Sequence, residues 1–379
     1  MRALLLILDS VGCGHAPDAA AYGDEGADTL GHIFAAHPQL ALPALFSLGL
    51  GEIIGSSHAP AATASHGRMR PRSAGKDTTT GHWELAGSIL DQPFATYPTF
   101  PPELVGAIGR EAGVAFIGNY AQSGTTILTE LGAEHLRTGH PILYTSADSV
   151  LQIAAHESVI PLPRLYEICR IARRHADAWR IGRVIARPFT GEPGAFQRTS
   201  GRHDYSAIPP RTVLNAIAEA GLPVEGVGKI SDIFAASGLT RSTPTASNAE
   251  GMAALDALWA DARDGLIFAN LVDFDSLFGH RRDVAGYARA LVEFDRWLAT
   301  FLPCCAPGDL LIITADHGND PTFPGTDHTR EEVPLLVLHA ARHDALGTRE
   351  TFADIAASLA GFFHLEPWSI GQSFLARPR

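Results

Sequence analysis

Acidic residues follow three apolar stretches of this chain, and histidines lie close behind two of them. The stretches cover residues 4–8, 267–272 and 310–314. The carboxylates and imidazoles beyond them form one candidate ligand set: Asp9, Asp275, His280, Asp316, His317 and His328. Carboxylate oxygen and imidazole nitrogen together suit Mn²⁺, Zn²⁺ or Fe²⁺. Metal binding is therefore the first chemistry that the sequence indicates.

The place of these residues after apolar stretches predicts that they meet. If the stretches are parallel strands of one sheet, their carboxyl ends open at the edge where open α/β sheets bind ligands. Six ligands are too many for one tetrahedral ion and suit two ions, which at about 3.5–4 Å from each other recur in phosphoryl transfer. The alternative is that each Asp or His forms a turn or a solvated loop. The repetition at three strand ends favours the metal site.

A threonine-rich segment, Gly75–Glu84, carries a second candidate for chemistry. Three consecutive threonines, Thr78–Thr80, lie between glycines and follow Lys76 and Asp77. A threonine hydroxyl is a weak nucleophile near neutral pH, and metal coordination is one way to activate it. Glycines allow the backbone to approach a phosphate, and the amides of a following helix can donate to it. The alternative is a threonine cluster that caps a helix, but a two-metal site nearby favours the nucleophile.

The elements that would position these residues alternate between strand and helix. Strand patterns cover 3–8, 114–118, 142–145, 183–186, 223–228, 267–272 and 309–314, and helical patterns cover 163–174, 211–220, 284–302 and 351–363. This alternation predicts an α/β protein with a mostly parallel sheet. A long middle stretch contains none of the candidate ligands. We therefore expect a discontinuous catalytic core, 1–92 and 210–379, that carries an inserted cap domain, 93–209.

Composition narrows the classes of function. Hydrophobic residues make up 46% of the 379 residues, so a large core is expected and disorder is not. A net charge of -12 without a long basic run argues against nucleic acid as a partner. We expect no membrane span, no signal peptide and no obligate protein partner. The four cysteines lack zinc-ribbon spacing and predict a reduced, cytoplasmic protein.

Several long segments resemble one known family, the phosphopentomutases of the alkaline phosphatase superfamily. The segments that carry the resemblance are 9–12, 26–32, 75–84, 144–157, 182–189, 202–205, 228–232, 270–283 and 314–331. The most specific are the two that read GKDTTTGHWE and TSADSVLQIAAHE. The resemblance extends nearly from end to end and includes the cap. It implies an alkaline-phosphatase-like fold, with a mostly parallel sheet between layers of helices and an inserted α/β cap.

The resemblance also implies roles for single residues. Thr78 would be the phosphorylated nucleophile, next to a metal held by Asp9, Asp316 and His317. The second metal would be held by Asp275, His280 and His328, and Mn²⁺ is the usual ion. The residues that would contact the sugar phosphate are Ser146, Asp148, Arg183 and Lys229.

The resemblance further implies the reaction and its small molecules. Ribose 1-phosphate and ribose 5-phosphate, and their deoxy forms, would be interconverted through a pentose 1,5-bisphosphate, as in nucleoside salvage. Glucose 1,6-bisphosphate or ribose 1,5-bisphosphate would prime the unphosphorylated enzyme.

Strand periodicity in the cap agrees with these roles. Ser146 and Asp148 would share a face if their strand continues through them, and Arg183 and Arg187 would share a face that could bind a distal phosphate. Arg187 could instead form an ion pair at a domain surface, and Asp148 could cap a helix. Four further histidines are expected to support the site or the packing rather than bind metal: His32, His82, His156 and His203.

Two other functions remain open from the sequence. One is a phosphatase, a phosphodiesterase or another mutase on the same metal core, which would need an open water path instead of a retaining cap. The other is a metal-binding protein without catalysis, in which substitution of Thr78 would change nothing.

Overall fold

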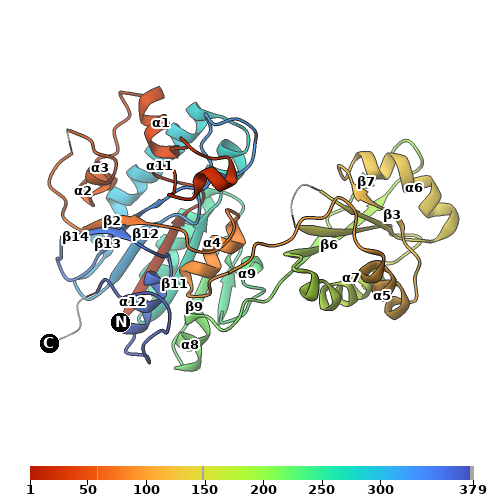
Figure 1. Ribbon diagram of the computed structural model, residues 1–379. Coiled ribbons are helices and arrows are strands. Elements are labelled where there is room, and N and C mark those ends of the chain that lie inside the picture. Colours follow the sequence, from red (N-terminus) through yellow and green to blue (C-terminus); the bar gives the residue numbers. More distant parts are fainter. Residues whose placement is uncertain (58, 147–148, 376–379) are drawn as a thin grey trace. The chain divides into compact units, whose positions relative to one another are not determined.

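The structure is a computed structural model that describes residues 1–57, 59–146 and 149–375. Asp148, one of the predicted sugar-phosphate contacts, lies outside the described residues. The chain folds into two compact units (Figure 1). Met1–Gln92 and Pro209–Arg379 form the core unit, and Pro93–Ile208 form the inserted unit.

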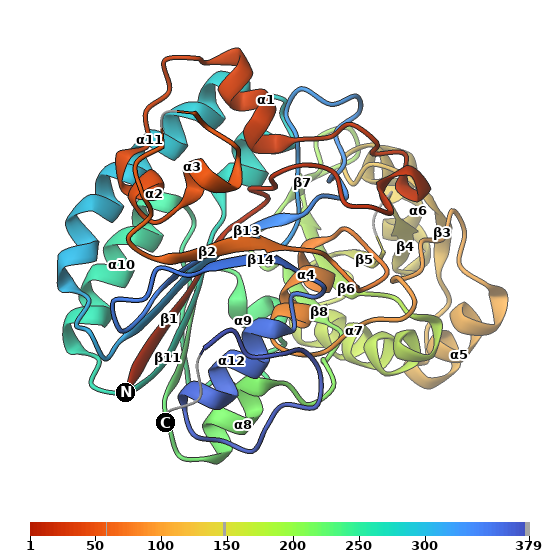
Figure 2. The same cartoon turned by 60° about the vertical axis from the view of Figure 1, so that its left-hand side comes forward.

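An eight-stranded sheet runs through the described part of the core unit (Figure 2). Its strands lie in the order β10 (Arg241–Thr243), β9 (Val224–Val227), β11 (Gly265–Leu271), β1 (Arg2–Leu8), β12 (Leu310–Thr314), β13 (Val333–Leu338), β2 (Ser65–Met69) and β14 (Ala345–Arg349). Neighbouring strands are parallel except where β13 pairs with β12 and β2. The expected mostly parallel α/β sheet is therefore confirmed.

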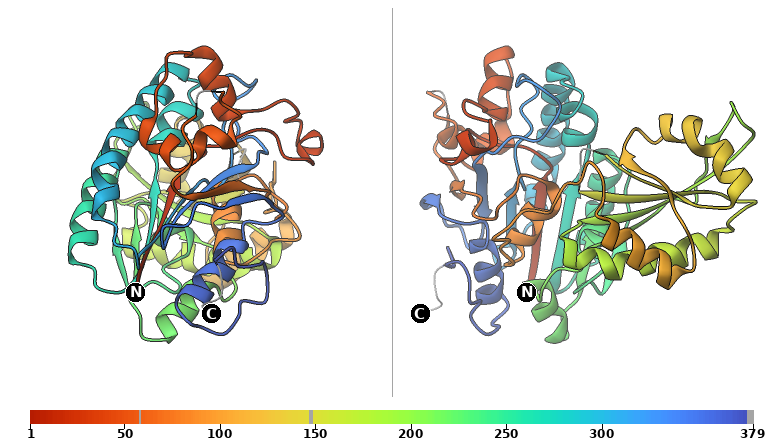
Figure 3. Two further views of the ribbon diagram at one scale, coloured as in Figure 1. Left: turned by 90° about the vertical axis from the view of Figure 1, so that its left-hand side faces the viewer. Right: turned by 45° about the vertical axis from the view of Figure 1, so that its right-hand side comes forward.

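Helices cover both faces of this sheet (Figure 3). One face carries α1 (Thr29–Ala36), α2 (Pro43–Ser47), α3 (Leu50–Ile53), α10 (Asn248–Asp261) and α11 (Val284–Phe301), and the other carries α4 (Thr78–Leu85), α8 (Val213–Glu219), α9 (Ile230–Ile233) and α12 (Asp354–Phe362). Short helical turns are η1 (Ala19–Tyr22), the π-helical η3 (Phe274–Gly279) and η4 (Leu302–Cys304). Strands β1, β11 and β12 lie between the two layers and are buried along almost their whole length. Burial on both faces explains why they read as continuous apolar runs.

The inserted unit contains its own sheet. The strand order is β3 (Ile117–Ala121), β4 (Ile142–Thr145), β5 (Val150–His156), β6 (Arg183–Thr190) and β7 (Gln197–Arg198), and β8 (His203–Ser206) also pairs with β6. The helices are α5 (Pro102–Ala112), α6 (Thr126–Thr138), α7 (Leu162–Ala176) and the short η2 (Asp177–Trp179). Two apolar clusters form its core, one beneath α5 and α7 and the other beneath α6.

Differences between the predicted and observed elements have local causes. The strand predicted at 114–118 is wrong at its start, because Gly113 ends α5 with φ 64 and the amide of Val114 still donates to Gly109. Strand β4 ends at Thr145, so the strand that was expected to carry Ser146 does not reach it. Seven strands of the described residues were not predicted, which are β2, β5, β7, β8, β10, β13 and β14.

In the part of the chain that the structure describes, we find no helix that is both long and apolar enough to cross a membrane.

Candidate metal centre

Three neighbouring strands bring the predicted ligands together. In the parallel register of β11, β1 and β12, Ile7 lies opposite Asn270 and Thr314, so the three strands end level with one another. Asp9 directly follows β1, Asp275 lies in η3 beyond β11, and Asp316 follows β12. The three carboxylates are almost completely buried. The sequence-predicted ligands thus converge at the carboxyl edge of the sheet.

One group of ligand atoms is formed by Asp9, Asp316 and His317. His317 Nε2 lies 3.5 Å from Asp9 Oδ1 and 3.2 Å from Asp316 Oδ2. All three atoms that could bind an ion lie within 4.8 Å of one another. The other ring nitrogen, Nδ1, lies 3.0 Å from the Gly318 carbonyl oxygen. A bond to that carbonyl leaves Nε2 free to face the carboxylates, as is usual for metal-binding histidines.

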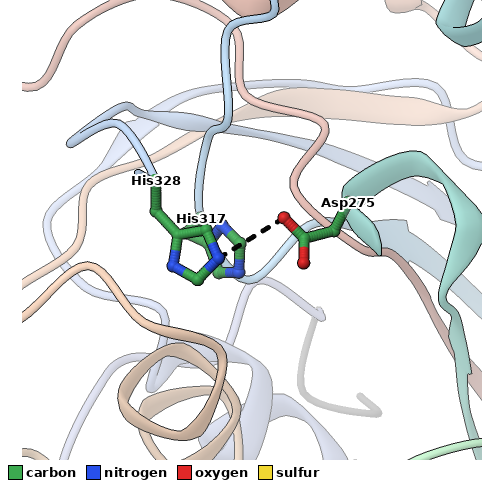
Figure 4. Close-up of side chains that lie close together, drawn as sticks. All are labelled: Asp275, His317 and His328. Carbon is green, nitrogen blue, oxygen red and sulfur yellow. Dashed lines mark ion pairs between the residues drawn. The ribbon is translucent and has the colours of Figure 1, made fainter. Parts of the chain in front are cut away.

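A second group surrounds Asp275 (Figure 4). His280 Nε2 lies 3.3 Å from Asp275 Oδ2, and His328 Nε2 lies 3.4 Å from Oδ1. The two imidazole nitrogens are 3.1 Å apart. His317 stacks on His328 with ring centroids 4.0 Å apart, and Asp275, His317 and His328 also meet the geometry of a metal group. His317 therefore stands between the two groups.

The chemistry of these residues fits a bound cation. Asp9 Oδ1 and Asp316 Oδ2 are buried and have no aligned hydrogen-bond donor among the described residues, although imidazole nitrogens lie within ion-pair distance. A buried carboxylate without full compensation is strongly destabilising. Lys229 is the nearest lysine partner, with Nζ 3.3 Å from Asp9 Oδ2. A divalent ion would satisfy the unpaired oxygens, and the residues present supply oxygen and nitrogen ligands for two such ions.

The protonation equilibria reflect the crowding of charge. Burial and the neighbouring Asp316 raise the pKa of Asp9. Burial also tends to raise the pKa of Asp316, but His317 and His82 outweigh it and the pKa falls below its usual value. Burial lowers the pKa of His317, yet the surrounding carboxylates, Asp316 foremost, raise it to about 10. The opposite pKa shifts of Asp316 and His317 stabilise the charged forms of both side chains, so the cluster favours positive charge beside its desolvated carboxylates.

The threonine segment lies beside the first ligand group. Asp77 caps α4 by accepting from the amide of Thr80, so the helix begins at Thr78. The Thr80 hydroxyl donates to the Asp77 carboxylate, whereas Thr78 Oγ1 lies 3.1 Å from His317 Nε2. A Cβ at Gly81 would collide with the carbonyl oxygen of Asp316, so this glycine permits the helix to pack against the ligand loop. The helix cap and the candidate nucleophile are therefore different residues.

The chain is similar in sequence to proteins of one known family over nearly its whole length. A family model described as the metalloenzyme superfamily matches residues 1–367. The phosphopentomutase of Anaeromyxobacter sp. (strain K) is 56% identical and the alignment covers 99% of this chain and 98% of that protein. Phosphopentomutases of Syntrophotalea carbinolica and Caldanaerobacter subterraneus subsp. tengcongensis are 54% and 51% identical, with 99% of this chain covered and 98% and 97% of those proteins. The chain belongs to the phosphopentomutase family of the metalloenzyme superfamily.

In this member of the phosphopentomutase family, buried polar residues support the ligands. His82, which the sequence placed in a supporting role, lies with Nδ1 3.1 Å from Asp316 Oδ2 and Nε2 3.2 Å from Asn270 Nδ2. Asn319 Nδ2 donates to Asp275 Oδ1 at 2.8 Å. Sequence reasoning missed Asn270 and Asn319. The signal for Asn319 was its place directly after the Asp316–Gly318 turn.

The predicted sugar-phosphate residues fall in both units. In the inserted unit, Arg183 and Arg187 share one face of β6. Arg187 Nε donates to Gln152 at 3.0 Å, and the ion pairs of the described residues include none at Arg187, contrary to the surface ion pair considered from the sequence. Burial, followed by the nearby Arg202 and Arg198, lowers the pKa of Arg187. Sequence reasoning did not name these two arginines as site residues. Asp204 pairs with Arg202 and lies 3.7 Å from Arg183, so this part of the inserted unit holds one carboxylate among four arginines.

Lys229, the predicted core contact to the sugar phosphate, directly precedes α9. Burial opposes its charge, but Asp9 and Asp275 raise its pKa. Ser146 is partly buried just beyond β4.

Proposed function

We propose that this protein is a metal-dependent phosphopentomutase. It interconverts ribose 1-phosphate and ribose 5-phosphate, and their deoxy forms, without a protein partner. Identity above half the residues over nearly the whole length of named phosphopentomutases supports the substrate class. The observation that carries the proposal is the Thr78 hydroxyl 3.1 Å from His317, at the edge of two adjoining ligand groups.

The proposed resting enzyme carries a phosphoryl group on Thr78. The free hydroxyl of the pentose phosphate attacks phosphorus, the Thr78 oxygen–phosphorus bond breaks, and the proton of the attacking hydroxyl replaces the phosphoryl group on Thr78. The product of this half-reaction is a pentose 1,5-bisphosphate. In the second half, the Thr78 hydroxyl attacks the other phosphoryl group, and the isomeric monophosphate leaves.

The chain's own residues position these events. Thr78 begins α4, so the first amides of that helix point towards a group bound to its side chain. His82 Nδ1 donates to the Thr78 carbonyl oxygen at 2.9 Å and so holds the first turn of the helix. Asp9, Asp316 and His317 would hold one Mn²⁺, and Asp275, His280 and His328 the other. When bound, the two ions neutralise negative charge on the transferring phosphoryl oxygens.

The inserted unit serves in this proposal as the cap that retains the bisphosphate. Ser146 and Asp148 would bind ribose hydroxyls, and Arg183 and Arg187 would bind the distal phosphate, with Lys229 contributing from the core unit. The half-buried cationic face around Arg187 supports this role, because desolvated guanidinium groups bind phosphate strongly. A retained intermediate is what separates a mutase from a hydrolase on the same metal core.

Phosphorus NMR tests the proposal directly. Purified protein is given Mn²⁺, ribose 5-phosphate and a catalytic amount of glucose 1,6-bisphosphate, which would phosphorylate Thr78. We expect ribose 1-phosphate without inorganic phosphate, and loss of transfer by about 10³-fold or more in Thr78→Ala, because the nucleophile is gone. Thr79→Ala is the matched control, since the neighbouring threonine has no contact to the ligand groups among the described residues.

Two other results would reject the proposal. Inorganic phosphate as the sole product would favour a phosphatase with an open water path. Mn²⁺ binding that is unchanged in Thr78→Ala, with no turnover of any pentose phosphate by the wild-type protein, would favour the metal-binding protein without catalysis.

A further inference from the structure

Arg282 joins the loops that carry the more exposed ligand group. Its guanidinium donates to four acceptors, which are Gly325 O at 2.6 Å, Gly279 O at 2.9 Å, Asn319 Oδ1 at 2.5 Å and Asp327 O at 3.0 Å. The donors of a guanidinium lie in one rigid planar fork. Acceptors bound to a single fork are therefore fixed relative to one another.

Three of these four acceptors adjoin or contact a ligand of the second group. Gly279 directly precedes His280, and Asp327 directly precedes His328. Asn319, held by Arg282 through its carbonyl, uses its amide nitrogen to donate to Asp275 Oδ1 at 2.8 Å. One side chain thus reaches all three ligands through a single intervening residue or peptide.

The loops also contact each other at the ligand itself. His280 Nδ1 lies 2.7 Å from the carbonyl oxygen of Thr326, which stands between two acceptors of Arg282. The bond fixes the ring so that Nε2 faces Asp275. Displacement of the 325–328 loop would therefore rotate His280 as well as move His328.

The backbone at Arg282 is itself held in an unusual conformation. Its φ is 55°, in the left-handed region that long side chains rarely adopt. Arg281, its neighbour, is exposed, whereas Arg282 is partly buried. The guanidinium contacts supply a reason for this conformation, because it directs the side chain between the loops.

We propose that Arg282 is a positioning residue that holds Asp275, His280 and His328 in register for the second metal ion. This inference rests on the proposed two-metal function. Arg282 does not touch the reacting atoms in this scheme, and it acts through the loops that it joins.

The test measures metal binding rather than turnover. Metal-free wild-type protein, Arg282→Gly and Arg281→Gly are titrated with Mn²⁺ by calorimetry, and bound manganese is counted per chain. Glycine suits the left-handed backbone, so the substitution removes the guanidinium without adding strain. We expect Arg282→Gly to bind one of two ions about 10–100-fold more weakly, the range for residues that orient metal ligands, while Arg281→Gly behaves as wild type.

Two further measurements separate positioning from a general loss of folding. Methylguanidinium, added to Arg282→Gly, should restore the affinity for the weakly bound ion by occupying the vacated space. In addition, the effects of Arg282→Gly and His280→Ala on the binding free energy of that ion should be less than additive, because both substitutions act on the same ligand group. Arg282→Lys should bind the ion weakly too, because one ammonium group cannot reach four separated acceptors.

The inference is overturned if Arg282→Gly binds both ions with wild-type affinity. Equal weakening of both ions, without recovery in methylguanidinium, would also overturn it, since that pattern indicates a fold defect. Failure of the wild-type protein to bind Mn²⁺ at all would instead reject the proposed metal-dependent function, so the two failures are distinct.

Discussion

The two ligand groups of the centre differ in both burial and composition. In the group around Asp316, the three side chains are between 0% and 3% exposed, and two carboxylates face one imidazole. In the group around Asp275, one carboxylate faces two imidazoles, and the side chain of His280 is 40% exposed. We call these the buried group and the open group.

The two groups therefore depend on a bound cation to different degrees. In the buried group, Asp9 Oδ1 and Asp316 Oδ2 find no aligned hydrogen-bond donor among the described residues, so a bound cation would stabilise them most. In the open group, Asn319 already donates to Asp275 Oδ1, and in spite of burial imidazoles near both oxygens lower the pKa of Asp275 as His317 and His82 lower that of Asp316. We therefore expect the buried group to bind its ion more tightly and to exchange it more slowly.

Substitution in the buried group should have the larger effect. Asp316→Asn removes a negative charge next to Thr78, and we expect transfer to fall by about 10²–10³-fold, as when one preorganised electrostatic group is removed. The fold should persist, because the amide has nearly the same shape. Excess Mn²⁺ should not restore activity, and circular dichroism with manganese counting checks both points. Wild-type activity with full metal content in Asp316→Asn would contradict the ligand assignment.

Substitution in the open group should be milder and recoverable. In His280→Ala, Asp275 and His328 remain, and the site is accessible to solvent. We expect Mn²⁺ affinity at one ion to fall by at least about 10-fold, and activity to return as Mn²⁺ is raised. Activity measured across a manganese titration gives the result. If His280→Ala resists recovery while Asp316→Asn recovers, the comparison between the two groups is reversed.

The sequence indicated the candidate metal ligands better than the residues that hold them in place. Strand-end Asp and His residues could be pooled because an apolar run followed by Asp marks a strand end, and parallel strands share an edge. The contacts of Asn319 and Arg282 could not be foreseen, because they depend on loop conformations, such as the left-handed backbone at Arg282. Strand β13, which is antiparallel to β12, was also missed. The direction of a buried strand cannot be read from its apolar residues. The cytoplasmic location, the choice of Mn²⁺ and the sugar-phosphate contacts stay predictions.

Glu331 is a third kind of buried carboxylate, which differs from both ligand groups in its hydrogen-bond donors. Glu331 is buried in the core unit, and among the described residues it forms no ion pair with an imidazole or a lysine. Its oxygens accept instead from neutral donors, including the Thr29 hydroxyl at 2.7 Å and the Thr329 hydroxyl at 2.6 Å. Burial raises its pKa to about 7, although these hydrogen bonds oppose the shift. Neutral donors thus compensate a buried carboxylate less well than the imidazoles around Asp275.

The smallest effect that we expect is on the pH dependence of stability, through the buried charge of Glu331. Because the folded pKa of Glu331 is about 7 and the reference value is 4.5, folding favours the protonated form. Its contribution to stability is complete below pH 4.5 and is lost as the pH rises to about 7, by up to about 3 kcal/mol. Glu331→Gln, which cannot ionise, should remove this decline from the urea-unfolding free energy measured from pH 4.5 to 8. Thr329→Val deletes a hydrogen bond to the charged form and should extend the decline to higher pH. If the unfolding free energies of wild type and Glu331→Gln run parallel across this pH range, hydroxyl donors compensate the buried charge fully. Imidazoles are then not needed to explain the low pKa of Asp275.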